Sequence, residues 1–134
     1  MIKNLHLTPG DRIVVPKSLF GIVQHHAVYA GNGCFYENKI GQGVVLTPWA
    51  EFFRGVSEVT SIQRFIGSYW ELQQAMNRAQ NSLGRAYHPV SFNCEHFANY
   101  VLCARPCSRQ VENAGGILGA LAVAFIGVQI IKSF

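Results

Sequence analysis

The sequence has little charge and no basic stripe. Charged residues make up 13% of the chain, and the 11 Lys and Arg that outnumber 7 Asp and Glu are scattered singly. Nucleic-acid-binding proteins gather basic residues on one face, so we expect no nucleic-acid partner. A mild positive excess suits an anionic membrane surface equally well, and the 49% hydrophobic content favours that environment.

The sequence also lacks signs of secretion and of a metal site. Its N-terminus, MIKNLHLTPGD, has no apolar stretch typical of a secretory signal, so we expect a reducing compartment and free thiols. Cys103 and Cys107 form one closely spaced pair without an obvious second pair, which argues against structural zinc. We therefore expect one domain, since 134 residues leave too little for two cores, and no structural metal.

Short β-rich segments separated by glycine turns fill the first sixty residues. Four strands of an antiparallel sheet are predicted, at residues 11–15, 25–30, 34–38 and 44–47. The dipeptide Asn32-Gly33 tolerates the positive φ angles of a tight hairpin, so the second and third strands should pair. This pairing would place His25 and Glu37 on neighbouring strands.

The helix signals are capping residues. A short helix is predicted at 49–54, with Thr47 as its cap and Pro48 in its first turn. After a possible strand at 58–66, the capping-box pair Ser68 and Glu71 opens a helix at 69–83, which Gly84 ends.

A third helix is predicted from residue 94 to about residue 104, with Asn93 as its cap and Cys94 in its first turn. Free N–H groups and the positive end of the helix dipole stabilise a thiolate at that place, so Cys94 is the candidate nucleophile. A buried Cys that only fills space in an amphipathic helix is the alternative.

His25 is the candidate general base. It lies in an apolar strand, where a partly desolvated imidazole is expected to stay neutral near physiological pH. His26 points to the opposite face, and spacing alone does not choose between the two or exclude a structural histidine. His88 and His96 are weaker candidates, because His96 lies about 200° around the helix from Cys94.

Glu37 is the candidate orienting group. It follows His25 by 12 residues across the hairpin, so its carboxylate can reach the ring nitrogen that does not face Cys94. An exposed charge at a strand end is the alternative.

The C-terminal run 114–131 has no charge and a single polar side chain, Gln129. As a helix its length is about 27 Å, close to the ~30 Å of a bilayer core. We expect residues 1–110 to form the catalytic domain and 111–134 a membrane-anchor segment; a buried core helix is the alternative. A face of small residues could pair two copies of the chain into a homo-oligomer: Gly116, Ala120 and Ala124.

The motifs GDRIVVP, HHAVYAGNG and FNCEHFANYV, followed by an apolar C-terminal segment, resemble the lecithin:retinol acyltransferase family and its small phospholipase A/acyltransferases. The resemblance spans most of the chain and implies a permuted papain-like α+β fold, with an antiparallel sheet packed on helices and a C-terminal apolar helix. It places the family's base on His25 and its nucleophile on Cys94. The third position, usually histidine in the vertebrate enzymes, is Glu37 here.

This resemblance implies a phospholipid acyl donor, an acyl-cysteine intermediate, and transfer to an amine, an alcohol or water. It also implies a tail anchor that holds the catalytic domain on the cytoplasmic side of a membrane, without a metal or a diffusible cofactor. Two alternatives remain: a non-catalytic or regulatory membrane protein, and a thiol peptidase or amidase.

Overall fold

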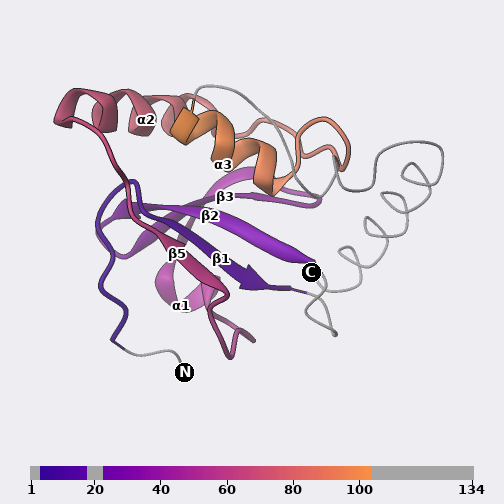
Figure 1. The fold of residues 1–134 in the computed structure, drawn as a ribbon. Coiled ribbons are helices and arrows are strands. Elements are labelled where there is room, and N and C mark those ends of the chain that lie inside the picture. Colours follow the sequence, from indigo (N-terminus) through magenta and orange to yellow (C-terminus); the bar gives the residue numbers. More distant parts are fainter. Residues whose placement is uncertain (1–3, 18–22, 104–134) are drawn as a thin grey trace, which may run out of the picture.

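The computed structural model describes residues 4–17 and 23–103. Within these ranges the fold is α+β, built on a five-stranded antiparallel sheet with the strand order β4-β3-β2-β1-β5 (Figure 1). The elements are β1 (Arg12–Pro16), β2 (Gln24–Gly31), β3 (Cys34–Lys39), β4 (Gly43–Pro48), α1 (Trp49–Phe52), β5 (Ser61–Gln63), α2 (Tyr69–Asn81) and α3 (Cys94–Cys103).

Helices cover both faces of this sheet. The longer helices α2 and α3 pack together on one face, and the short α1 lies on the other (Figure 1). Alternate side chains along each strand therefore enter two different cores. The core under α2 and α3 contains Val28, Tyr36, Val44, Ala75, Ala79, Phe92, Phe97, Ala98 and Val101. The core around α1 contains Ile13, Val15, Ala27, Phe35, Phe52, Phe53 and Val56.

The predicted hairpin between β2 and β3 is confirmed. Asn32 and Gly33 have φ angles of 53° and 71°, the left-handed conformation that this dipeptide accepts at low cost. The ladder pairs Tyr29 with Phe35 and continues to Ala27 opposite Glu37. His25 and Glu37 therefore lie on neighbouring strands, as expected.

The predictions for the first two helices were partly correct. The capping box of α2 is confirmed, since Ser68 and Glu71 each bond the other's backbone N–H, although the helix ends at Asn81 rather than at residue 83. The predicted cap of α1 was wrong by one residue. Pro48 is the N-cap of α1, and Thr47 stays paired in β4, where its side chain is buried.

The strand expected at 58–66 is shorter than predicted. Of the residues 58–66, only Ser61–Gln63 form a strand, which pairs with β1 through three residue pairs. Helix α3 begins at Cys94 as predicted.

The expected apolar helix at 114–131 lies outside the described residues. Within those residues no helix is both long and apolar enough to cross a membrane.

Candidate active site

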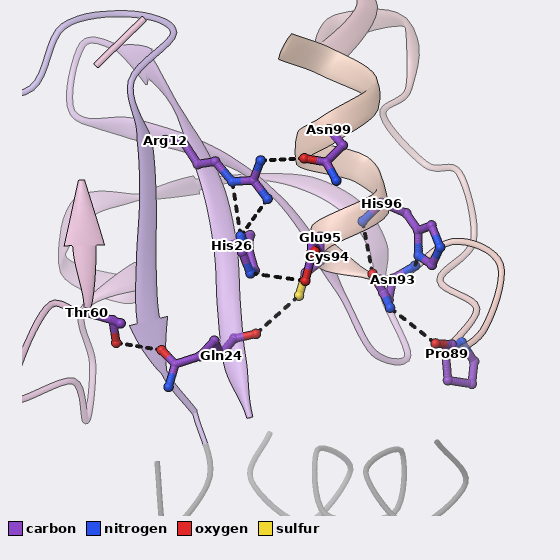
Figure 2. A network of polar contacts seen from close by, with 10 residues as sticks. All are labelled: Arg12, Gln24, His26, Thr60, Pro89, Asn93, Cys94, Glu95, His96 and Asn99. Atoms are coloured by element: carbon purple, nitrogen blue, oxygen red, sulfur yellow. Dashed lines mark hydrogen bonds and ion pairs between the residues drawn. The ribbon is translucent and has the colours of Figure 1, made fainter. Parts of the chain in front are cut away.

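Cys94 is the first residue of α3 and is 4% exposed. Asn93 precedes it and accepts a hydrogen bond of 3.0 Å from the backbone N–H of His96. In return, Nδ1 of His96 accepts one of 3.1 Å from the N–H of Asn93 (Figure 2). This reciprocal pair is a capping box with histidine at the position usually held by Glu or Gln. It fixes the helix start and gives His96 a capping role that the sequence reading missed.

The sulfur of Cys94 lies at the end of the ladder between β2 and β3. Pairing of β2 with β3 ends at Ala27, while pairing with β1 continues to Gln24. Sγ of Cys94 lies 3.7 Å from the carbonyl oxygen of Gln24, beyond the last residue pair of the ladder between β2 and β3 (Figure 2). The imidazole of His25 lies close enough to this thiol for Cys94 to raise the His25 pKa through hydrogen bonding and through charge, and both residues line the same pocket.

The far side of the His25 ring is held by Glu37. Nε2 of His25 lies 2.8 Å from Oε1 of Glu37, and the two residues are 3% and 1% exposed. Because Nε2 donates to the carboxylate, Nδ1 is the ring nitrogen that can serve Cys94. The three residues expected from the sequence thus meet in one chain of contacts, in the order Cys94, His25, Glu37.

The electrostatics of His25 differ from the expectation. Burial alone lowers the pKa of His25, but hydrogen bonds and charge interactions with Cys94 and Glu37 outweigh it and raise this pKa from 6.5 to about 9. The prediction of a neutral imidazole near physiological pH was therefore wrong, because it counted desolvation and omitted the two partners. A proton on His25 at physiological pH makes the imidazole a proton donor at the site.

Glu37 remains a carboxylate in this setting. Burial raises its pKa, but His25 lowers it through a hydrogen bond and through charge, and Thr47 and Lys39 lower it further, so the net shift is downward. Oε2 of Glu37 makes no hydrogen bond within the described part of the chain. Only one carboxylate oxygen is thus committed to the imidazole.

His26 belongs to a different cluster on the other face of β2. Its Nδ1 accepts from Nε of Arg12 at 3.0 Å and from Nη2 at 2.7 Å, and its Nε2 lies 3.6 Å from Oε2 of Glu95 (Figure 2). Nη1 of Arg12 also donates to Oδ1 of Asn99. Glu95 and Asn99 are one turn apart on α3, so this cluster fixes α3 against the sheet.

Cys94 lines a narrow pocket, whose volume is about 210 Å³ when the open solvent at its mouth is included. Its lining is Lys17, Val23, Gln24, His25, Asn38, Tyr87 and Cys94. Burial and the nearby Cys94 raise the pKa of Tyr87, so its phenol stays protonated and remains a donor at physiological pH. Sequence reasoning missed Lys17, Asn38 and Tyr87, because no local pattern shows that these separate segments converge.

The remaining candidates lie elsewhere. Nδ1 of His88 accepts from the backbone N–H groups of Val90 and Ser91 at 3.2 and 3.1 Å, so it stabilises the turn before α3. No group of three His, Cys, Asp or Glu side chains that could hold a metal ion occurs in residues 4–17 and 23–103.

Comparison of the chain with models of protein families gives no match, and no curated protein matches it. The interpretation of the site therefore depends on its own geometry and on the motifs HHAVYAGNG and FNCEHFANYV.

Proposed function

We propose that the protein is a phospholipid-directed thiol acyltransferase and phospholipase A that works through an acyl group on Cys94. The observation that carries this proposal is the buried chain of contacts from Cys94 through His25 to Glu37 at the start of α3. This is the arrangement of nucleophile, base and orienting group that covalent acyl transfer requires. The order of His-bearing strands before the Cys-bearing helix also agrees with a permuted papain-like fold.

In the first half-reaction the Cys94 thiolate attacks the ester carbonyl carbon and forms a C–S bond. The first turn of α3 presents backbone N–H groups and a positive dipole end to the developing oxyanion. His25 then gives its proton to the departing glyceryl oxygen, the C–O bond breaks, and a lysophospholipid leaves. The products are an acyl-thioester on Cys94 and a neutral His25.

In the second half-reaction water, an amine or an alcohol attacks the thioester carbon. His25 takes a proton from the attacking group, the C–S bond breaks, and the thiolate–imidazolium pair is restored. Glu37 stabilises the charged imidazole at both stages, because its carboxylate contacts the ring nitrogen opposite Cys94.

Two features favour a phospholipid as the acyl donor. Lys17 lines the pocket together with Cys94 and offers an ammonium to the phosphodiester of a headgroup; this ammonium lies 5.7 Å from the centroid of the Phe52 ring. The apolar run at 114–131 would keep the site at the surface that holds an insoluble substrate.

Incubation of the full chain with radiolabelled phosphatidylcholine vesicles, with and without an added primary amine, tests the proposal. We expect released fatty acid and acylated amine, both lost in Cys94→Ser and in His25→Ala. Cleavage of a peptide or amide library without lipid turnover would instead favour a thiol peptidase or amidase. Absence of any turnover and of any acyl-enzyme would contradict the proposal and favour a regulatory role.

A further inference from the structure

Asn38 is a fully buried polar residue at the pocket, and the mechanism above does not use it. It follows Glu37 on β3 and is 0% exposed. Its Nδ2 donates to the backbone carbonyl of Phe92 at 2.9 Å and to that of Asn93 at 3.3 Å. These two carbonyls accept only, so they fix which end of the amide is nitrogen and which is oxygen.

The oxygen of the same amide has no partner. Oδ1 of Asn38 makes no hydrogen bond to any described residue, although the residue lines the pocket together with His25 and Cys94. A buried acceptor without a donor is unfavourable and is uncommon in folded proteins. A guest that enters the pocket and brings an N–H or an O–H within hydrogen-bond distance of Oδ1 would satisfy it.

We infer that Oδ1 of Asn38 is the acyl-acceptor subsite, which holds one hydrogen of the attacking group while His25 takes another. This inference rests on the proposed acyl-Cys94 chemistry and specifies its second half-reaction. The attacking atom needs two hydrogens: one for Oδ1, and one that passes to His25 as the C–N or C–O bond forms and the C–S bond breaks. Water and primary amines have two, whereas alcohols and secondary amines have one.

Asn38 is therefore a specificity-determining residue. An acceptor with one hydrogen gives that hydrogen to His25 and leaves Oδ1 buried and unpaired, so its attack is penalised relative to a primary amine. Sites built to hydrogen-bond a polar group reject analogues that lack the group much more strongly than apolar pockets reject a missing methylene.

The test uses the full chain and a p-nitrophenyl ester, whose burst of nitrophenol reports acylation of Cys94 separately from deacylation. The acyl-enzyme is then offered two competing acceptors, and the ratio of the two acylated products is measured. One pair of acceptors is n-butylamine and N-methylbutylamine, which are similar in basicity, and the other pair is water and n-butanol. We expect the wild-type enzyme to prefer the primary amine about tenfold more than a free thioester does. We expect Asn38→Leu to lose that extra preference.

The partition ratio is measured within one sample, so it does not depend on the fraction of enzyme that is folded. Asn38→Asp keeps an oxygen at the Oδ1 position but removes the donor to Phe92 and Asn93, so it should lower all rates while keeping the ratio. Asn99→Leu is the matched control, because its amide contacts Arg12 and does not line the pocket. It should leave the ratio unchanged.

The outcomes separate this inference from the proposed function. A wild-type enzyme without a burst would refute the acyl-Cys94 proposal and the subsite with it. A normal burst with a ratio equal to that of the free thioester would refute the subsite alone, even if Asn38→Leu failed to fold. A ratio that Asn38→Leu leaves unchanged would also refute it.

Discussion

His25 and His26 are neighbours in the sequence, yet the structure places them in two unrelated clusters. His25 faces the α1 side of the sheet and contacts Glu37 and Cys94, whereas His26 faces α3 and contacts Arg12 and Glu95. The strand's alternation separates the faces, but the partners decide the chemistry. A carboxylate and a thiol favour a proton on His25, while the Arg12 guanidinium requires an unprotonated Nδ1 on His26.

The largest expected effect on turnover comes from replacing Cys94, the thiol that belongs to the His25 cluster and not to the His26 cluster. Cys94→Ser should reduce lipid turnover at least about 1,000-fold, because an alcohol is a far weaker acid than a thiol and gives far less of the anionic nucleophile. Radiolabelled product release measures it. Cys34→Ser and Cys103→Ser are the controls, since neither residue lines the pocket, and each should retain activity within about twofold. Full activity in Cys94→Ser would show that Cys94 is not the nucleophile.

The two histidines should respond differently to the same substitution. His25→Ala should lower turnover about 100-fold or more, because it removes the proton carrier. His26→Ala should instead lower the free energy of unfolding by about 1–3 kcal/mol, because Arg12 and Glu95 lose a buried partner. Urea denaturation and turnover are measured on both variants. The reverse pattern would show that the strand register is shifted by one residue.

Glu37→Gln tests what sets the charge on His25. The amide keeps the size of the side chain but loses its charge, so the pKa of His25 should fall from about 9. We expect turnover to decrease about 100-fold, and its decline on the basic side to begin at lower pH than in the wild-type enzyme. A pH profile of kcat checks this, and an unchanged basic limb would show that Glu37 does not control the imidazole.

The same pKa predicts how stability depends on pH. The folded-state pKa of His25, about 9, exceeds its ordinary 6.5, so its protonated form stabilises the fold fully below pH 6.5. That contribution should be lost as the pH rises from 6.5 through 9, by up to about 3 kcal/mol. Urea unfolding at several pH values measures it. In His25→Ala the free energy of unfolding should no longer depend on pH between 6.5 and 9. If His26→Ala removed that dependence instead, the effect would belong to the His26 cluster and the prediction would be wrong.

The smallest effect on the chemistry is expected from removing residues 114–134. Both histidine clusters lie before Cys103, so the truncated chain should keep activity on dispersed substrate within about twofold while losing membrane residence. Membrane fractionation and circular dichroism of the full and truncated chains measure the two properties. Aggregation or a lowered melting temperature of the truncated chain would favour the buried-core alternative, and a full-length chain free of membranes without detergent would contradict the anchor.

Local signals predicted much of this fold. The Asn32-Gly33 turn and the Ser68–Glu71 capping box each depend on a few adjacent residues, and both were confirmed. The contact between His25 and Glu37 followed from the hairpin and from strand alternation, so the sequence predicted it as well.

Long-range contacts were not predictable in this way. Arg12 meets Asn99 across 87 residues, and Asn38 reaches the carbonyl of Phe92 across 54, with no periodic pattern linking either pair. The charge of His25 was misjudged for the same reason, because it depends on partners that only the folded chain brings together. Packing between α3 and the sheet decides these features.

The central claim is that the His25 cluster, and not the His26 cluster, activates Cys94 for acyl transfer. Mass spectrometry of the Cys94 peptide, after brief exposure of the full chain to phosphatidylcholine vesicles and an acid quench, tests it most directly. The account predicts one hydroxylamine-sensitive acyl group on Cys94 in the wild-type enzyme and in His26→Ala, and none in His25→Ala. An unmodified Cys94 in the wild-type enzyme, or an acyl group that survives in His25→Ala and disappears in His26→Ala, would contradict it.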